Sequence, residues 1–309
     1  MGKKLAITIG DPAGVGAEII RTWAEKNPGI ISRAEVIAHA SFLDTLPDSI
    51  GKRKVGDSGY KARAGFPDSS GAVVAFEALE AAAAGCVEGR YFAVTTAPVS
   101  KAEMKKVGFN FAGQTEFFAD RWGGNPVMAF AGEHFLLSLV TWHEPLRVVP
   151  DSITAEKIAR AVESARIIAS RAKGIQYPRI AVCALNPHAG ENGILGLEEI
   201  ESINPVLDTL RADERYRNLS SALPPDTVFE RAIKGEFDSI VSMYHDQGLA
   251  PLKAIDFDNA VNISMNLPFV RTSPDHGTGF GIAGRGIASA NSFECAVNLA
   301  FKLGDSSSE

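Results

Sequence analysis

The chain has 309 residues, 45% of them hydrophobic, and a formal net charge of −6 at pH 7. A chain of this length and composition can bury one large core or two moderate ones. The acidic balance and the lack of a Lys/Arg-rich run exclude a nucleic-acid-binding surface as the main function.

The cysteines and the apolar runs indicate the cellular compartment. Cys86, Cys183 and Cys295 are an odd number without a CxxC pair, so they are expected to be buried and reduced. No apolar run reaches the roughly 20 residues that span a bilayer, so no membrane span is expected. The N-terminal MGKKLAITIG enters a strand-like run at once, which leaves no room for the apolar core of a signal peptide. We expect a cytoplasmic protein without nucleic-acid or membrane partners.

Short strand-like segments alternate with longer helical ones, which predicts an α/β architecture with a mostly parallel sheet. Thr154 is a candidate N-cap for the longest helix, and Lys173–Gly174 is its candidate C-terminus. Because no linker divides the chain, a second lobe would form where the chain leaves one sheet region and returns to it. The tail 304–309 is expected to be disordered. The predicted elements, in chain order, are strand 4–10, helix 17–26, strand 34–39, helix 71–84, strands 91–97, 126–132 and 135–141, helix 154–173, and strands 179–185, 238–244 and 260–265.

The first Gly-rich segment is ITIGDPAGVGAEII, which follows a strand and opens a helix. Gly10, Gly14 and Gly16 give the spacing GxxxGxG, whereas a Rossmann dinucleotide site needs GxGxxG and an acidic strand end further on. The segment therefore does not indicate a Rossmann site. It could still direct backbone N–H groups and Asp11 into a cleft.

The second Gly-rich segment is DHGTGFGIAGRGIASAN, residues 275–291. Closely spaced glycines remove steric bulk, so this segment suits a loop that wraps around a flat ligand, with His276 and Thr278 as polar contacts. The alternative is a flexible surface loop, which is disfavoured because the apolar Phe280 and Ile282 interrupt the glycines.

Four of the six histidines follow strand-like runs or lie in Gly/Pro-rich loops, where functional residues concentrate. Three imidazoles at strand ends could bind one divalent cation and leave a position open for a substrate oxygen. The alternative is a set of unrelated loop histidines, because no HExxH signature is present. His39 and His134 have apolar neighbours and are expected to be partly buried structural residues. The four candidates are His143, His188, His245 and His276.

Several cationic and amide side chains could bind an anion. Lys253, Asn262 and Arg271 follow the HDQG turn on successive elements, and together they would suit a phosphate or carboxylate. Lys101 follows another strand end and could join them. The segment GQTE, residues 113–116, could cap a helix at Thr115 or offer an amide and a hydroxyl to the anion. Each of these groups taken alone is more often a solvated surface residue.

Seven of these segments form a series along nearly the whole chain: TIGDPAGVGAE, TTAPVSKAEM, GQTEFFA, TWHEPL, ALNPHAGENG, YHDQGLAPLK and PDHGTGFGIAG. The series resembles the motifs of the 4-hydroxythreonine-4-phosphate dehydrogenase (PdxA-like) family. The resemblance implies a two-lobed α/β/α fold shared with isopropylmalate and isocitrate dehydrogenases. One lobe would comprise about residues 1–125 with 270–309, and the other about 126–269. It also implies a homodimer with the site near the interface.

The resemblance implies an activity as well. The family oxidises the 3-hydroxyl of 4-phosphohydroxy-L-threonine in vitamin B6 (pyridoxal phosphate) synthesis, with NAD or NADP as the acceptor. The β-keto acid so formed loses CO2 and leaves 3-amino-2-oxopropyl phosphate. A divalent metal, with zinc expected ahead of magnesium or cobalt, would polarise the substrate oxygen.

Carried over residue by residue, the resemblance assigns the metal to His143, His188 and His245. Asp246 and Lys101 are candidate proton acceptors, and Asp246 could instead orient His245. The loop HGTGFGIAGRGIA is similar to the adenosine-binding loop of the related dehydrogenases. Its implied cofactor contacts are His276, Gly277, Thr278 and Gly284. The implied contacts to the small anionic hydroxy-acid substrate are Gln114, Thr115, Lys253, Asn262 and Arg271.

The chain departs from the family pattern at two positions. The family usually has GHTE where this chain has Gln114, and Gln cannot carry positive charge toward an anion. Gly281 stands where the family more often has Asp. The substrate could therefore be another hydroxy acid, such as threonate or erythronate 4-phosphate or a cyclic diol carboxylate.

Two other classes of protein remain open. A phosphate-handling transferase on a related scaffold would not need three histidines. A catalytically silent paralogue would bind a metabolite without turning it over. Formation of the reduced nicotinamide separates both from a dehydrogenase.

Overall fold

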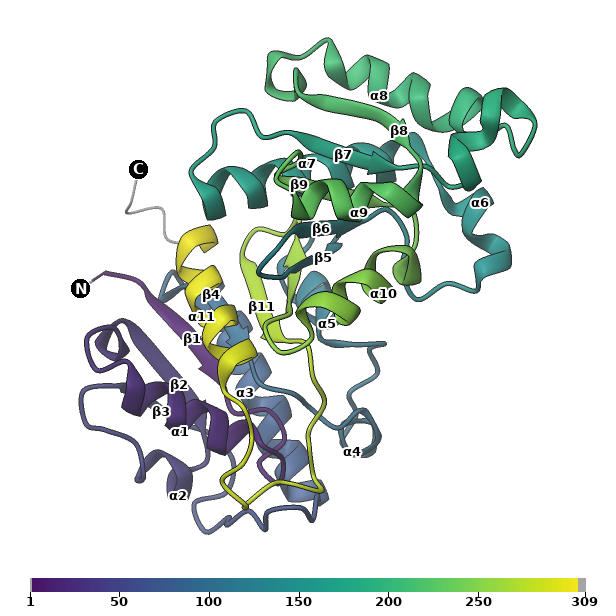
Figure 1. The fold of residues 1–309 in the computed structure, drawn as a ribbon. Helices are drawn as coiled ribbons and strands as arrows, with labels where there is room; N and C mark the ends of the chain where they lie inside the picture. Colours follow the sequence, from purple (N-terminus) through teal and green to yellow (C-terminus); the bar gives the residue numbers. More distant parts are fainter. Residues whose placement is uncertain (1, 305–309) are drawn as a thin grey trace. The chain divides into compact units, whose positions relative to one another are not determined.

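Figure 1 shows the computed structural model, which describes residues 2–304. The chain divides into two compact units. One contains the residues up to Pro126 and those from Val261 onward, and the other runs from Val127 to Ala260. The boundary expected between residues 269 and 270 falls inside a hairpin of the first unit, and the division lies at Ala260 instead. The tail expected to be disordered was 304–309: Gly304 instead ends helix α11 (Asn291–Gly304), and residues 305–309 lie outside the described part of the chain.

The first unit is built on strands in the order β3–β2–β1–β4–β11–β10. Neighbouring strands pair in parallel, except that β10 and β11 form an antiparallel hairpin. The strands are β1 (Lys4–Thr8), β2 (Ala34–Ala38), β3 (Gly51–Lys54), β4 (Tyr91–Thr96), β10 (Val261–Met265) and β11 (Val270–Pro274). The sheet is mostly parallel, as predicted from the alternation of strands and helices.

Helices cover the strands of the first unit. The long helix α3 packs against β1, β2 and β4, and α11 packs against β4, β10 and β11. The helices are α1 (Gly16–Lys26), η1 (Ile31–Arg33), α2 (Ala40–Leu43), α3 (Ser69–Val87), α4 (Lys101–Lys106), α5 (Gln114–Trp122) and α11 (Asn291–Gly304).

Helix α3 corrects the premise that no segment is long and apolar enough to span a bilayer. Its 19 residues are long and apolar enough, by length and composition, to cross a bilayer. In this structure, however, its alanine-rich surface lies in the hydrophobic core of the first unit, with Ala78, Leu79 and Ala82 almost fully buried. Small side chains let the helix approach the strands closely, and they raise its mean hydropathy at the same time.

The second unit has strands in the order β5–β6–β9–β7–β8. Only β5 and β6 pair in antiparallel fashion, and the other pairs are parallel. The strands are β5 (Val127–Ala131), β6 (Leu136–Leu139), β7 (Ile180–Cys183), β8 (Leu219–Leu223) and β9 (Ser239–Ser242). The helical segments are η2 (Leu146–Val148), α6 (Val149–Ser152), α7 (Ala155–Lys173), η3 (Pro187–Gly193), η4 (Glu199–Ile203), α8 (Asn204–Arg211), η5 (Glu214–Tyr216), α9 (Pro225–Ile233) and α10 (His245–Asp256).

Helices α7 and α10 cover opposite faces of these strands. The Ser138 hydroxyl on β6 donates a hydrogen bond to the Ala161 carbonyl on α7, at 2.8 Å. The preceding residue, Leu137, instead meets α10, where a Cβ on Gly248 would lie 2.6 Å from its Cδ2 atom. Because consecutive residues of a strand point to opposite faces, the second unit has the layered α/β/α arrangement.

The predicted ends of α7 are confirmed. The Thr154 hydroxyl accepts the backbone N–H of Lys157 at 3.3 Å, which satisfies one free donor of the first turn. Gly174 ends the helix in the left-handed conformation, with φ of 70°.

Three strands were not predicted, because their residues are polar. Strand β3 reads GKRK and is the last strand of its sheet, where charged side chains discourage pairing with other chains. Strand β8 reads LSSAL and holds the same position in the second unit. Strand β11 reads VRTSP and lies between β4 and β10, so it is polar for a different reason, described below.

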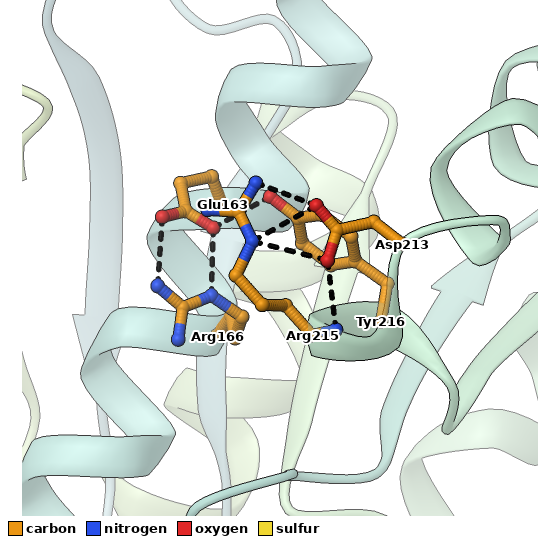
Figure 2. Close-up of polar contacts among 5 residues, drawn as sticks. All are labelled: Glu163, Arg166, Asp213, Arg215 and Tyr216. Atoms are coloured by element: carbon orange, nitrogen blue, oxygen red, sulfur yellow. Dashed lines mark hydrogen bonds and ion pairs between the residues drawn. The ribbon is translucent and has the colours of Figure 1, made fainter.

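A cluster of polar contacts fastens helix α7 to the turn η5 in the second unit (Figure 2). The Glu163 carboxylate accepts hydrogen bonds from Arg166, at 2.7 and 2.8 Å, and from the Tyr216 hydroxyl, at 2.7 Å. Burial opposes the charge of Glu163, but these hydrogen bonds outweigh it and lower the pKa of the carboxyl. Burial and the bond to Glu163 raise the pKa of Tyr216 to about 12.

We expect Tyr216→Phe to lower the free energy of unfolding by about 1–2 kcal/mol at pH 7, because it removes a hydrogen bond to a charged group. Folding lowers the pKa of Glu163, so its contribution is fully present above the ordinary Glu pKa and is lost as pH falls below that value through the lowered pKa. The difference between wild type and variant should therefore shrink at low pH. Urea unfolding at pH 7 and pH 3.5 measures it, and Tyr177→Phe, outside the cluster, is the control. An equal loss in both variants would contradict the role of the Glu163 bond.

Candidate active site

The parallel strands β6, β9 and β7 are neighbours, and their carboxyl ends lead to the three predicted metal ligands. The pairing of β6 with β9 continues beyond the strands, because the N–H groups of Val140 and Thr141 donate to the carbonyls of Ser242 and Met243, at 2.9 and 3.1 Å. The Thr141 hydroxyl adds a second bond to the Met243 carbonyl, at 2.8 Å. This extended register brings the segments before His143 and His245 side by side.

His143 and His245 come close together. Their ring centroids are 5.7 Å apart, with the planes tilted by 39°. The Nδ1 atom of His245 lies 2.7 Å from a carboxylate oxygen of Asp246. A carboxylate on one ring nitrogen fixes the orientation of an imidazole and leaves the other nitrogen for a metal. The Asp246 carboxylate thus contacts His245 in the way that the predicted orienting role requires.

Gln247 ties the ends of two of these strands together. Its side-chain oxygen accepts the N–H of Met243 at 2.7 Å, and its amide nitrogen donates to the carbonyl of Ala184, at the end of β7, at 2.7 Å. A signal for this residue was present in the HDQG turn, because a side-chain amide can donate and accept at once. Sequence reasoning used only its neighbours.

Two of the three predicted ligands have an unusual backbone. His143 has φ of 51° and His188 has φ of 52°, in the left-handed region that non-glycine residues seldom adopt. Six of the described non-glycine residues have positive φ. Four of these six, including His188 itself, lie in the turn η3. Strained backbone concentrates at functional sites, since the surrounding structure must hold it in place.

Within residues 2–304, no group of three or more His, Cys, Asp or Glu side chains lies close enough to hold a metal ion. The structure brings His143 and His245 together but does not bring His188 into the same group. The His188 side chain is 68% exposed, and its Nδ1 atom lies 3.8 Å from a carboxylate oxygen of Glu191 in its own turn.

In the first unit, Arg271 on β11 is the centre of a polar cluster. The residue is only 5% exposed, and its guanidinium donates to the Thr96 hydroxyl at 2.7 and 3.0 Å and to the Asn262 side-chain oxygen at 2.9 Å. Burial lowers the pKa of Arg271 to about 9, while nearby Glu116 and Asp275 oppose that shift, so the group is charged at neutral pH. Hydroxyl and amide oxygens orient this cation without neutralising it, which suits it to an anionic ligand. This is why β11 is polar although it lies between two other strands.

Thr115 and Gln114 lie in the same unit. Thr115 does not cap a helix, which corrects one of the two readings of GQTE: α5 begins at Gln114, and the buried Thr115 hydroxyl lies 2.8 Å from that of Ser264. The Gln114 amide nitrogen donates to the Ala97 carbonyl at 3.5 Å, a long bond, while its oxygen is buried without a protein partner. An unsatisfied acceptor in the interior favours a position that faces a ligand.

The two lysines are exposed. Lys101 is the first residue of α4, directly after the N-cap Ser100, whose hydroxyl accepts the N–H of Glu103. Lys253 belongs to α10, the same helix that begins at His245. The other five predicted anion-binding residues, Lys101 included, lie in the first unit, and Lys253 lies in the second.

The two Gly-rich segments meet in the first unit. The N–H of Val15, just before α1, donates to the carbonyl of Thr278 at 2.9 Å. A Cβ on Gly14 would lie 2.6 Å from that same carbonyl, so only glycine permits the approach. The N–H of Gly284 donates to the Glu18 carboxylate on α1, and the Nε2 atom of His276 is buried without a protein partner. The loop is therefore anchored on α1, and His276 retains a free donor or acceptor.

The remaining histidines differ from each other. His39 is buried, as predicted. His134 is partly exposed and pairs with the buried Asp256, at 2.6 Å, so the prediction that it is partly buried by apolar neighbours holds only in part.

Comparison with known proteins assigns the chain to a family. The family model described as pyridoxal phosphate biosynthetic protein PdxA matches residues 10–300. A 4-hydroxythreonine-4-phosphate dehydrogenase from Xanthomonas campestris is 39% identical over 325 residues, which cover 98% of this chain and 99% of the relative. The chain belongs to the PdxA family. The match runs from the first Gly-rich segment to helix α11, so it includes every predicted site residue.

Solved structures agree with this assignment. The crystal structure of 4-hydroxythreonine-4-phosphate dehydrogenase from Klebsiella pneumoniae is similar, with a TM-score of 0.84 at 31% identity over 98% of this chain and 100% of that one. The isocitrate dehydrogenase of Methylococcus capsulatus shares the fold, with a TM-score of 0.50 at 13% identity over 97% of this chain and 85% of that one. The predicted fold class and its kinship to the isocitrate dehydrogenase fold are thus confirmed for this PdxA family member.

Because His245 is one of three predicted imidazole ligands, we expect His245→Ala to weaken binding of Co²⁺ or Zn²⁺ by at least about tenfold. The visible absorption of bound Co²⁺ measures the affinity. His134→Ala in the same unit is the matched control, since its imidazole pairs with Asp256 and not with His143. Undiminished Co²⁺ affinity in His245→Ala would remove that residue from the metal site.

Proposed function

We propose that this chain is an NAD-dependent 4-hydroxythreonine-4-phosphate dehydrogenase of pyridoxal phosphate synthesis. It would oxidise 4-phosphohydroxy-L-threonine and release CO2 to give 3-amino-2-oxopropyl phosphate. The observation that carries the proposal is the pair His143 and His245 at adjacent strand ends, with Asp246 on His245, in a member of the PdxA family. A silent paralogue has no need to maintain a strained backbone at two candidate metal ligands.

The anion-binding residues would orient the substrate. Arg271 supplies a charged planar fork that suits a phosphate or carboxylate, and Thr96 and Asn262 hold that fork in place. Thr115 adds a buried hydroxyl, and the ammonium group of Lys253 would supply a second positive charge. Fixed anionic groups turn the reacting C–H into one orientation, which lowers the entropic part of the barrier.

The oxidation removes a hydride from the substrate carbon and a proton from its oxygen. The residues proposed to hold a divalent cation are His143, His188 and His245, and a zinc, magnesium or cobalt ion there would act as a Lewis acid on the substrate oxygen. Neutral imidazoles favour zinc or cobalt over magnesium, which prefers oxygen ligands. The candidate proton acceptors are Asp246, which contacts His245, and Lys101 on the exposed start of α4.

The loop after β11 is the proposed nicotinamide-cofactor site. Glycines with positive φ at 279, 284 and 286 shape it, and its anchor on Val15 and Glu18 keeps its path fixed. NAD or NADP bound there would accept the hydride. The residues assigned to it are His276, Gly277, Thr278 and Gly284.

We also propose a cytoplasmic homodimer with the site near the interface. Four large apolar side chains are exposed in the segment that directly follows the turn of His188. Exposed apolar groups gathered in this way mark contact surfaces, and two-fold dimers are the commonest assemblies. Sedimentation velocity measures the assembly. The four residues are Ile194, Leu195, Leu197 and Ile200.

The proposal is tested by incubating the purified protein with 4-phosphohydroxy-L-threonine, a divalent metal and either NAD or NADP. Absorbance at the wavelength of the reduced nicotinamide should rise, and chelation of the metal should stop it. Parallel reactions contain threonate 4-phosphate, erythronate 4-phosphate and a cyclic diol carboxylate. A rate with one of these alone would replace the substrate, and no reduced nicotinamide with any of them would refute the dehydrogenase.

Arg271→Ala should raise KM for a phosphorylated substrate by about one to two powers of ten, since a charge-assisted hydrogen bond contributes about 1.5–3 kcal/mol. Arg271→Lys should restore part of the loss, because an ammonium keeps the charge without the planar fork. Steady-state kinetics measure both, and Arg90→Ala, an exposed arginine just before β4, is the control. An unchanged KM would place Arg271 outside the substrate site.

Gln114→His tests the departure from the family pattern. If the substrate is 4-phosphohydroxy-L-threonine, the family's usual His should be tolerated or should raise kcat/KM. If the chain prefers another acid, Gln114→His should lower kcat/KM for that acid by roughly one to two powers of ten, since a mispaired buried polar contact costs about 1–3 kcal/mol. It should then raise the rate on 4-phosphohydroxy-L-threonine. Both values are measured in wild type and variant, and no change in either would mean that the unsatisfied oxygen of Gln114 does not face the substrate.

A further inference from the structure

The turn that carries His188 is a short left-handed helix. The five residues from His188 to Asn192 all have positive φ, between 44° and 77°, and only Gly190 among them is glycine. L-residues adopt this conformation at a cost, normally one residue at a time. Such a run persists only if contacts from outside the turn stabilise it. The structure must therefore contain a residue that holds the turn in the left-handed conformation.

Glu199 is the residue that holds this turn. Its side chain is 1% exposed, and one carboxylate oxygen accepts the backbone N–H groups of Leu185 and Asn186, at 2.8 and 2.9 Å. The other oxygen accepts the side-chain amide of Asn186 at 3.0 Å. These residues come directly before the turn, so the carboxylate fixes the point at which the chain enters it.

Two glycines let the turn close over this carboxylate. A Cβ on Gly190 would lie 2.7 Å from Glu199 Oε2 and 2.8 Å from the Gly196 carbonyl. A Cβ on Gly196 would lie 2.2 Å from the Asn186 amide nitrogen. The N–H of Leu195 closes the turn by donating to the Gly190 carbonyl at 3.0 Å. The buried carboxylate thus contacts the turn at its entry and at its middle.

Stability alone does not account for a carboxylate here. The three donors on Glu199 are neutral amides, and a buried charge without a cationic partner is costly. Aligned N–H groups at a fixed backbone corner do require a strong acceptor, and a carboxylate binds several at once. The free-energy cost of burying the Glu199 carboxylate is explained if the protein requires a fixed direction for the His188 side chain.

We infer that Glu199 is a positioning residue for His188: it imposes the left-handed turn η3 and so fixes the direction in which the His188 imidazole projects. The inference rests on the proposed function for the role of His188 as a ligand. Glu199 touches neither metal nor substrate in this role and acts through the backbone of residues 185–193.

The test compares three variants of the full-length protein. Glu199→Leu removes both acceptors, and Glu199→Gln keeps one oxygen for the two N–H groups but turns an amide toward that of Asn186. Glu201→Gln changes an exposed carboxylate in the same helical turn and is the matched control. In metal-free protein, hydrogen exchange of residues 185–195 should rise strongly in Glu199→Leu, less in Glu199→Gln and not at all in Glu201→Gln.

The metal readout separates positioning from stability. Co²⁺ affinity of the folded protein should fall by about 10- to 100-fold in Glu199→Leu, the range for supporting groups of metal ligands, with partial rescue in Glu199→Gln. In a His188→Ala background, Glu199→Leu should cause little further loss, because the two changes act on one ligand. A general effect on folding would instead lower the affinity equally in both backgrounds.

Each result decides the matter. Faster exchange with unchanged Co²⁺ affinity, or a full further loss in the His188→Ala background, overturns the positioning role while leaving the proposed metal site intact. Unchanged exchange in Glu199→Leu overturns it as well. If wild-type protein does not bind Co²⁺ through His245, the proposed function fails first, and the role of Glu199 toward a metal fails with it.

Discussion

The parallel register of β6, β9 and β7 is the constraint on which the candidate site depends. Three neighbouring strands that run in the same direction must end at the same edge, so whatever follows them is gathered there. The bonds from Val140 and Thr141 to the chain of β9 extend that register past the sheet, and Gln247 extends it to β7. A slip of one residue in this pairing would turn each strand over and separate the two imidazoles.

Backbone strain accompanies this geometry. His143 and the turn of His188 both use left-handed conformations, and the buried Glu199 carboxylate holds the entry to the turn of His188. A relaxed backbone would let the imidazoles leave the strand ends freely. A strained backbone within a well-packed unit can keep ligand side chains in place before a metal binds. Less conformational entropy is then lost on binding.

In the first unit the main feature is a buried positive charge, the guanidinium of Arg271. A guanidinium buried between two strands and held by oxygen atoms of neutral side chains keeps its field, because low-dielectric surroundings screen it weakly. The hairpin of β10 and β11 supplies both Arg271 and its partner Asn262, so one antiparallel turn sets their spacing. Polar side chains on a strand inside the sheet thus indicate the candidate anion-binding site. The same polar residues are the reason why β11 was not predicted as a strand.

The sequence by itself determined the α/β class, eight of the strands, the helices α1, α3 and α7 and the caps of α7, because these depend on local periodicity and on single cap residues. It also determined the family, since motifs such as ALNPHAGENG and YHDQGLAPLK retain their order along the chain, and it named Arg271, Asn262, His143 and His245. Only the tertiary structure decided that Thr96 orients Arg271, that Thr115 faces Ser264 instead of capping α5, and that α3 is a core helix. It alone decided that Glu199 supports the turn of His188 and that His188 stays outside the pair formed by the other two histidines. These facts depend on contacts between residues from 13 to 175 positions apart in sequence, and no local pattern records which distant group a side chain will meet.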